Sequence, residues 1–170
     1  MRKNLVLTGM MGVGKSTIGK SLAVKLKMNL SDIDKIIENR ENMVINEIFK
    51  LKGEQYFRKI EKKTSLDELK RENSIIALGG GAFIDQQIRE EVLKNCTSFW
   101  LDLSVDNLAR RLLSSYERPL LKKNNLKEEL NNLFIKRKEK YGLANFRIDC
   151  NNVKKTEIVD KRFNGVYERT

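Results

Sequence analysis

The stretch Gly9-Met10-Met11-Gly12-Val13-Gly14-Lys15-Ser16-Thr17 decides the fold of this 170-residue chain. It satisfies the pattern G-x-x-x-x-G-K-[ST] in full, which is typical of a phosphate-binding loop between a strand and a helix. The flanking sequence agrees, because the apolar run Leu5-Val6-Leu7 precedes it and Ile18 and Leu22 follow at helical spacing. The alternative, a glycine-rich turn with an accidental lysine, is disfavoured by this combination of motif and context.

Each part of this loop has a physical role in binding a nucleoside triphosphate. The glycines let the backbone curl so that successive N–H groups point at phosphate oxygens, and the following helix adds its positive N-terminal dipole. Lys15 is expected to reach the β- and γ-phosphates, and the Ser16 hydroxyl to bind Mg²⁺. The predicted nucleotide-binding residues of the loop are Gly12, Val13, Gly14, Lys15, Ser16 and Thr17. The motif leaves the acceptor open among water, a nucleotide, a metabolite and a protein motion.

Short apolar runs alternate with segments of helical spacing along the rest of the chain. Further runs with strand character are Ile75–Leu78, Ser98–Leu101 and a weaker Phe146–Ile148. Strands that alternate with helices predict an α/β fold whose parallel sheet is covered on both faces. Residues 34–72 are charged and mostly helical in pattern, without a strand. With one proline and no linker or repeat, residues 1–170 are expected to form a single domain.

Two carboxylates follow the position where a second strand is expected to end. Residues two apart at a strand end point to the same face, so Asp32 and Asp34 could both face the phosphate loop. One would suit a water-mediated contact to Mg²⁺, and the other would suit binding an acceptor hydroxyl and taking its proton. The alternative is that one of them caps a helix beginning near Lys35.

A glycine triplet, Gly79-Gly80-Gly81, directly follows the run Ile75–Leu78. Three glycines at the carboxyl end of a strand let a ligand approach the backbone closely. Open α/β sheets bind their ligands at that edge. The triplet is therefore a candidate part of the site, with a flexible turn as the alternative.

Arg137 continues an apolar helical stripe, three residues after Phe134 and four before Tyr141. A guanidinium on an apolar face needs an anionic partner. That partner could be an internal carboxylate or a ligand carboxylate held by two hydrogen bonds. Arg58 is a weaker candidate, because by itself it is more typical of a solvated helix charge.

Arg118 lies in the polar segment 113–125, which resembles a mobile loop and contains the only proline, Pro119. The proline biases Arg118 toward an extended backbone. An arginine on such a loop could move onto the transferring phosphate and stabilise its charge. The alternative is an exposed loop cation.

The composition narrows the chemistry further. Lys and Arg number 34 against 23 Asp and Glu, giving a formal charge of +11, and histidine is absent. The absence of histidine excludes Ser-His-Asp and Cys-His nucleophile systems and histidine-ligated metal sites. The basic excess indicates either anionic partners or a charge that serves solubility. Cys96 and Cys150 predict buried thiols in a reducing compartment, and the N-terminal sequence predicts neither a signal peptide nor a membrane span, so we expect a cytoplasmic protein.

Taken in order, these segments resemble the shikimate kinases, small P-loop kinases of the nucleoside-monophosphate-kinase-like group. Apart from the phosphate loop each motif is weak alone, but six in the same order and spacing are specific. The resemblance covers about residues 4–145. Its motifs are Gly9–Thr17, Asp32 with Asp34, GExxFRxxE at Gly53–Glu61, Gly79–Gly81, RPLL at Arg118–Leu121, and RxxxY at Arg137–Tyr141.

The resemblance implies a three-layer P-loop kinase fold, with a five-stranded parallel sheet flanked by helices. It also implies a substrate-binding region at about 33–61 and a lid at about 112–125. The implied reaction transfers the γ-phosphate of ATP to the 3-hydroxyl of shikimate, giving shikimate 3-phosphate and ADP in aromatic amino-acid biosynthesis. The expected partners are ATP, shikimate and Mg²⁺, with no nucleic acid and no membrane, and the enzyme is expected to be a monomer.

The resemblance also implies a role for each matched residue. Lys15, Asp34 and Arg118 would be catalytic. The metal would be served by Ser16 and, through water, by Asp32. The implied shikimate-binding residues are Asp34, Arg58, Gly79, Gly80, Gly81 and Arg137, while Arg110 and Arg118 would join the phosphate loop in binding ATP.

Two other classes of function compete with this interpretation. The first is another small-molecule P-loop kinase, acting on gluconate or a nucleoside monophosphate, which would lack this combination of motifs. The second is a nucleic-acid-binding or regulatory ATPase module, which the charge permits. No RNA-binding aromatic motif or zinc finger occurs in the sequence, so the second class is also disfavoured.

Overall fold

The computed structural model describes residues 3–114 and 125–163, and it contains a five-stranded sheet in which every strand pair is parallel. The strand order is β2-β3-β1-β4-β5. This confirms the predicted parallel α/β sheet. The strands are β1 (Leu5–Thr8), β2 (Asn29–Asp32), β3 (Ser74–Ala77), β4 (Thr97–Asp102) and β5 (Phe146–Asp149).

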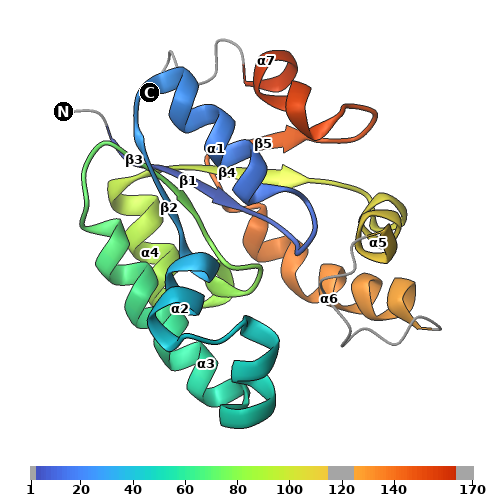
Figure 1. The fold of residues 1–170 in the computed structure, drawn as a ribbon. Helices are drawn as coiled ribbons and strands as arrows, with labels where there is room; N and C mark the ends of the chain where they lie inside the picture. The colour runs from blue at the N-terminus through green and yellow to red at the C-terminus, as the bar shows by residue number, and fades with distance from the viewer. Residues whose placement is uncertain (1–2, 115–124, 164–170) are drawn as a thin grey trace.

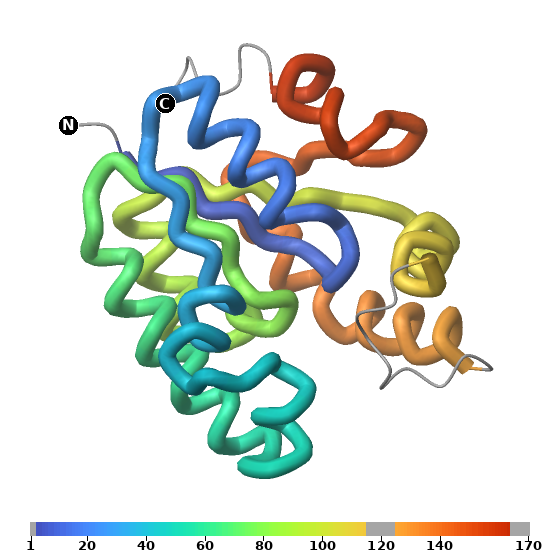
Figure 2. The backbone as a smooth tube through the Cα atoms, in the orientation of Figure 1, coloured from blue at the N-terminus to red at the C-terminus, as the bar shows by residue number. Residues whose placement is uncertain are grey.

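Helices cover both faces of the sheet, as Figures 1 and 2 show, with α1 and α7 on one side and α3, α4 and α6 on the other. The α-helices are α1 (Lys15–Leu26), α2 (Ile33–Glu41), α3 (Ile45–Leu69), α4 (Gln86–Asn95), α5 (Val105–Ser114), α6 (Leu126–Tyr141) and α7 (Ile158–Arg162). Two short 3₁₀ helices are η1 (Ala82–Ile84) and η2 (Lys155–Glu157). The three-layer arrangement predicted from the sequence is therefore confirmed.

The central strands form the core of the molecule. Every residue of β1, β3 and β4 is buried, because both faces of these strands are covered. Parallel strands buried in this way read as short continuous apolar runs. In α1, Ile18 and Leu22 are fully buried, as their helical spacing predicted. The parallel pairing of β1 with β3 places their carboxyl ends side by side, where the phosphate loop and the glycine triplet begin.

Three local details add to or differ from the sequence expectations. The second strand ends at Asp32, and the chain becomes helical at Ile33, so Asp34 lies in the first turn of α2 and not at a strand end. Helix α3 is broken at Gly53, where φ is 82° and ψ is 167°. The first part of the expected lid, Leu112–Ser114, is the last turn of α5, and residues 115–124 lie outside the described part of the chain.

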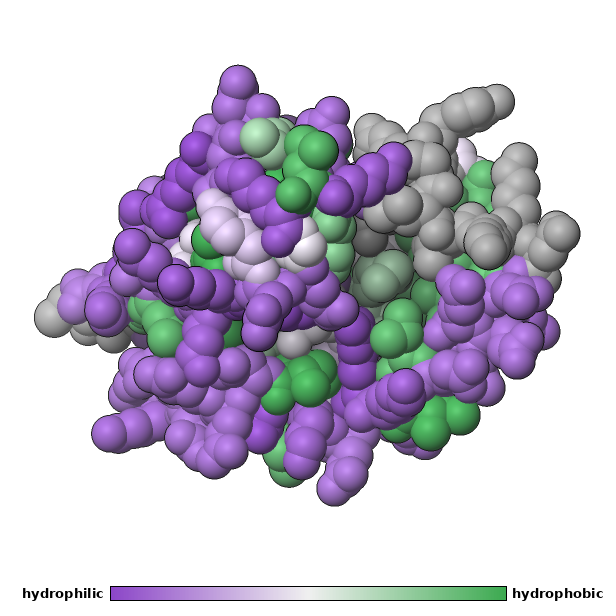
Figure 3. Space-filling model, turned by 90° about the horizontal axis from the view of Figure 1, so that it is seen from below, coloured by the Kyte–Doolittle hydropathy of each residue, from purple (hydrophilic) through white to green (hydrophobic). Residues whose placement is uncertain are grey.

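The surface agrees with a chain in which charged residues make up 34% of the sequence. Seen from below, most of the molecular face is hydrophilic, with separate apolar areas (Figure 3). Large apolar side chains that are exposed include Leu51 on α3 and Ile135 on α6. Among the residues the structure describes, no helix is long and apolar enough to cross a membrane.

Candidate active site

The phosphate loop curls because its glycines adopt conformations that other residues avoid. Gly9, Gly12 and Gly14 have φ values of 137°, 79° and 105°. Lys15 folds back over the loop, and its Nζ donates hydrogen bonds to the carbonyls of Gly9 at 2.8 Å and Met10 at 3.0 Å. The ammonium group of Lys15 therefore already lies across the loop. Phosphate oxygens could replace these carbonyls as acceptors.

The start of α1 is built to receive an anion. Its N-cap is Gly14, which has no side chain to satisfy the first N–H groups of the helix. Those N–H groups and the helix dipole favour a negatively charged ligand. Ser16 and Thr17, in the first turn, are exposed. Their hydroxyls are therefore accessible to a ligand bound at the loop.

Asp32 is the N-cap of α2, which was one of the two alternatives for this carboxylate, and its role toward Mg²⁺ stays a prediction. Its Oδ1 accepts a hydrogen bond from the Lys35 N–H at 3.3 Å and so caps α2. Its Oδ2 is buried and has no hydrogen-bond partner among the described residues. A buried carboxylate oxygen without a partner is costly unless a ligand, water or ion satisfies it. The residues present therefore fit a hydrated Mg²⁺, although the described residues contain no cluster of three or more His, Cys, Asp or Glu that could hold a metal.

Asp34 reaches the glycine triplet from the first turn of α2, so the expected placement at the end of the strand was wrong, and the expectation that it faces the phosphate loop stays a prediction. A Cβ built on Gly79 would lie 2.9 Å from Asp34 Oδ1 and would collide with Glu61 Oε1. The helix begins early because the Asp32 cap starts it at Ile33. The helical turn then places Asp34 beside the backbone of Gly79.

The glycine triplet is required for close approach and not for unusual backbone angles. Gly79, Gly80 and Gly81 are absent from the glycines with positive φ. A Cβ on Gly81 would lie 2.5 Å from Arg58 Nη1, and a Cβ on Gly80 would lie 3.3 Å from the Met11 N of the phosphate loop. Side chains here would push the arginine and the phosphate loop away. The triplet therefore permits close approach of the protein's own groups, and the approach of a ligand to this backbone stays a prediction.

Arg58 is held by carboxylates of its own helix. Its Nη1 lies 2.6 Å from Glu61 Oε2, and its Nη2 lies 3.4 Å from Glu54 Oε1. Burial raises the pKa of Glu61 above its ordinary value, although Arg58 opposes this shift. Burial alone would lower the pKa of Arg58, but Glu61 and Glu54 outweigh it and raise that pKa. The guanidinium is thus fixed as a cation beside Gly81.

Arg137 is half-buried on α6 and turned toward the glycine triplet. Its Nη1 donates to the Gly80 carbonyl at 3.1 Å. Within residues 3–114 and 125–163, no carboxylate forms an ion pair with it. Of the two partners that the sequence left open, an internal carboxylate is present only at longer range, since Glu61 interacts electrostatically with Arg137 without forming an ion pair with it. The remaining donor capacity of the guanidinium is available to a ligand carboxylate.

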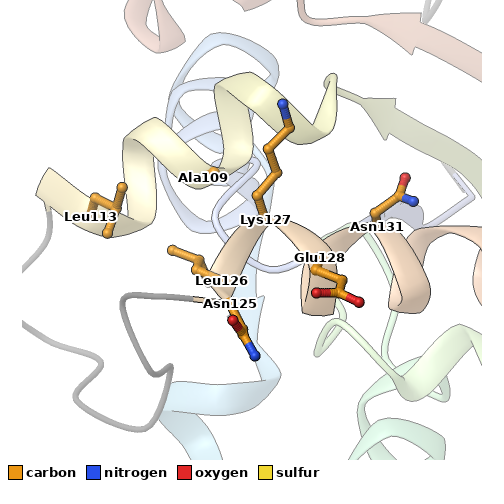
Figure 4. Close-up of a pocket in the computed structure, with 7 residues that line it drawn as sticks. All are labelled: Ala109, Leu113, Asn125, Leu126, Lys127, Glu128 and Asn131. Carbon is orange, nitrogen blue, oxygen red and sulfur yellow. The ribbon is translucent and has the colours of Figure 1, made fainter.

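These groups surround a cavity of about 390 Å³. It is lined by Glu54, Arg58, Glu61, Lys62, Gly81, Ile84, Asp85, Ile88 and Arg137. A slightly larger cavity of about 450 Å³ lies between α5 and α6 and includes Ala109, Leu126 and Lys127 (Figure 4). None of the predicted site residues lines the larger cavity. The smaller one holds the charges that could bind an anionic substrate, so we take it as the acceptor side.

The nucleotide side contains two residues that the sequence did not indicate. Arg111 Nη1 donates to the Val13 carbonyl of the phosphate loop at 2.8 Å. Lys155 crosses Gly14, since its Cδ would lie 3.1 Å from a Cβ built there. Both residues are far from the phosphate loop in the sequence. They could be predicted only if the folding of α5 and η2 over the loop were already known.

The other predicted nucleotide-side residues are placed differently. Arg110 is exposed on α5, one position before Arg111. After the larger effect of Lys127, Arg110 helps to lower the pKa of Asp106. Arg118 lies outside the described residues. The structure therefore brings together the phosphate loop, Asp32, Asp34, Arg58, the glycine triplet and Arg137.

A parallel sheet with a phosphate loop after β1, facing a charged acceptor cavity, defines a P-loop kinase of a small anionic molecule. The family model described as shikimate kinase matches residues 11–166. The shikimate kinase of Sulfurihydrogenibium sp. is 40% identical over 98% of this chain and 99% of that protein. The chain belongs to the shikimate kinase family, and it is an ATP-dependent kinase.

Two solved structures bear on the choice between kinases. The structure of shikimate kinase from Acinetobacter baumannii in complex with shikimate matches with a TM-score of 0.88 and 30% identity, covering 95% of this chain and 90% of that one. A gluconokinase from Sinorhizobium meliloti matches with a TM-score of 0.59 and 15% identity over 94% of this chain and 90% of that one. The second likeness shows a shared fold alone.

Proposed function

We propose that this site transfers the γ-phosphate of ATP to the 3-hydroxyl of shikimate, giving shikimate 3-phosphate and ADP. The observation that carries the proposal is Arg137, a half-buried guanidinium at the acceptor cavity with no ion-paired carboxylate among the described residues. Arg58 adds a second cation across the same cavity. Together they suit a substrate with one carboxylate, while Asp34 beside Gly79 suits its hydroxyl groups.

The nucleotide would bind along the loop Gly12–Thr17. Lys15 would exchange its hydrogen bonds to loop carbonyls for bonds to phosphate oxygens, and so carry its charge with the transferring group. Arg118, and Arg110 through its place on α5, would add further cationic groups. Arg111 and Lys155 join this set because both contact the loop.

On the acceptor side, Asp34 would orient the reacting hydroxyl and accept its proton. The main catalytic contribution in phosphoryl transfer is positioning and neutralisation of charge, which needs no histidine. Glu61 would keep Arg58 in place without touching the substrate. The backbone of Gly79–Gly81 would form the surface against which the substrate packs.

Ser16 and Asp32 would hold Mg²⁺, with the buried and unpartnered Oδ2 of Asp32 as the supporting observation. When bound, Mg²⁺ supplies charge neutralisation of the phosphate oxygens. The protein's part is to present the Ser16 hydroxyl and to hold the buried Asp32 carboxylate at the carboxyl end of β2.

We also infer that residues 1–170 act as one domain, with a substrate-binding region at about 33–61 and a lid at about 112–125. The enzyme is proposed to work as a cytoplasmic monomer without nucleic acid or membrane partners. The charge of +11 would then be mainly a surface property that assists the capture of anionic substrates. Light scattering would test the monomeric state, and a salt titration of RNA binding would test the absence of a nucleic-acid partner.

An acceptor panel tests the proposal directly. Folded protein with ATP and Mg²⁺ is incubated with shikimate, gluconate or AMP, and ADP release is measured. We expect release that depends on shikimate and is at background with the other two. Release with gluconate or AMP instead would identify another small-molecule kinase, and release without any acceptor would indicate an ATPase module.

A further inference from the structure

Tyr141 is a buried, ionisable side chain that has no role in the mechanism described so far. It is the last residue of α6, four positions after Arg137, and it is fully buried. Its ring stacks on Trp100 of β4, with 6.1 Å between the ring centroids. Packing therefore fixes the ring, and the position of its hydroxyl follows from the core.

The hydroxyl of Tyr141 contacts two parts of the active site, the glycine triplet and the phosphate loop. It donates to the Gly80 carbonyl, with 2.5 Å between the two oxygens, and it lies 3.8 Å from Met10 Sδ of the phosphate loop. The same Gly80 carbonyl accepts from Arg137 Nη1 at 3.1 Å. One carbonyl thus links the tyrosine and the arginine, at the point where the glycine triplet passes the phosphate loop.

The chemistry of the hydroxyl fits a fixed donor. Burial raises the pKa of Tyr141 above its ordinary value, against the opposing effect of Arg137, so the group stays protonated at neutral pH. A carbonyl oxygen has two acceptor sites, and at Gly80 they are taken by the rigid hydroxyl of Tyr141 and the half-buried guanidinium of Arg137. Removing the tyrosine donor would leave Arg137 as the one side-chain donor to the Gly80 carbonyl within residues 3–114 and 125–163, and both groups could then rotate together.

We propose that Tyr141 is a positioning residue that orients Arg137 for the substrate carboxylate by holding the Gly80 carbonyl. The tyrosine itself does not touch the substrate. The inference rests on the proposed role of Arg137 in binding shikimate. It assigns a function to the tyrosine of the RxxxY motif, which the phosphate chemistry leaves unexplained.

The test compares Tyr141→Phe with the parent enzyme in steady-state kinetics. Loss of one hydrogen bond that orients a binding group should raise the KM for shikimate about 3- to 10-fold. The KM for ATP should stay within about twofold, because the phosphate loop keeps its own contacts. A KM does not depend on the fraction of enzyme that is folded, so a less stable variant still reports this split. Tyr141→Met, which is also apolar and lacks the hydroxyl, should show the same pattern.

Ser98→Ala provides the matched control. Ser98 is another buried hydroxyl, and it bonds Asn145 between α6 and β5 without contacting the site. Its loss should lower the melting temperature and leave both KM values unchanged. A similar rise of the shikimate KM in this control would show that losing a buried hydroxyl remote from the site has the same effect as losing that of Tyr141, and would overturn the inference.

The Arg137→Ala background separates the two proposals. If Tyr141 acts through Arg137, the double variant should have the same shikimate KM as Arg137→Ala alone. Multiplied effects in the double variant, or an unchanged KM in Tyr141→Phe, would contradict the role of Tyr141 and leave that of Arg137 intact. An unchanged shikimate KM in Arg137→Ala would instead contradict the proposed function of Arg137 itself.

Discussion

The two sides of the active site are built in different ways. The phosphate side is one continuous stretch, Gly9–Thr17, whose backbone shape comes from glycines with positive φ. The acceptor side takes Asp34 from α2, Arg58 and Glu61 from α3, and Arg137 from α6, all against Gly79–Gly81 after β3. A backbone-built site depends on few side chains, whereas an assembled site depends on how several elements pack. Variants should therefore affect the two sides separately.

The largest effect is expected on the phosphate side, from Lys15→Ala. This change removes the ammonium that lies across the loop and should lower kcat about 10³-fold, a typical loss for a group that stabilises transition-state charge. Steady-state kinetics with saturating ATP and shikimate measure it. Lys20→Ala, an exposed lysine one turn further along α1, is the matched control and should retain kcat. A kcat loss below about tenfold in Lys15→Ala would contradict the comparison.

On the acceptor side, Arg137→Ala should raise the KM for shikimate about 10- to 100-fold and leave the KM for ATP almost unchanged. The reason is the loss of a charged hydrogen-bond donor, which is worth about 1.5–3 kcal/mol. Initial-rate measurements with each substrate varied in turn separate the two constants. Lys136→Ala, its exposed neighbour on α6, should alter neither. Equal effects of Arg137→Ala on both substrates would show that the two sides are not independent.

Gly79→Ala tests whether the acceptor side depends on packing. The added Cβ would collide with Glu61 Oε1 and lie 2.9 Å from Asp34 Oδ1, so we expect a loss of about 1–3 kcal/mol in unfolding free energy and weaker shikimate binding. Gly142→Ala is the control, since its Cβ would have ordinary contacts at 3.4 Å. Urea unfolding of both variants checks this. A Gly79→Ala protein as stable as the parent would show that the glycine triplet is a permissive turn.

The difference between the continuous phosphate side and the assembled acceptor side also explains which site residues could be predicted from the sequence. The phosphate loop and the glycine triplet are contiguous, so their residue types carry the signal by themselves. Arg137 was predicted as a candidate site residue because its positive charge interrupts an apolar stripe along one helix. Glu61 was assigned no role, because one carboxylate among the many charges of α3 becomes distinctive only when it is buried against Gly79. Lys155 was missed because only the folded chain places it over Gly14.

A smaller effect concerns pH and the buried Glu61, which faces Arg58, Asp34 and Arg137. Burial raises its pKa above 4.5, so the folded state favours the protonated form. The resulting contribution to stability is full below pH 4.5 and is lost as pH rises through the folded-state pKa. Urea unfolding between pH 4 and 7 should therefore show the parent losing stability relative to Glu61→Gln. The direction of this slope should persist in an Asp34→Asn background, because burial is the largest cause of the shift, and its absence in both backgrounds would contradict the direction of the shift.

The smallest effect is expected from Lys155→Ala on the phosphate side. Burial and then the neighbouring Arg111 lower the pKa of Lys155, and no carboxylate in the described parts of the chain forms an ion pair with either cation. Nucleotide phosphates would relieve their repulsion. Since Lys155 is partly exposed, its loss should raise the KM for ATP only about 2- to 5-fold and leave the KM for shikimate unchanged. Lys161→Ala, an exposed lysine of α7 paired with Glu157, is the control and should change neither constant. A selective effect of Lys155→Ala on shikimate would place this lysine on the acceptor side and break the separation between the two halves of the site.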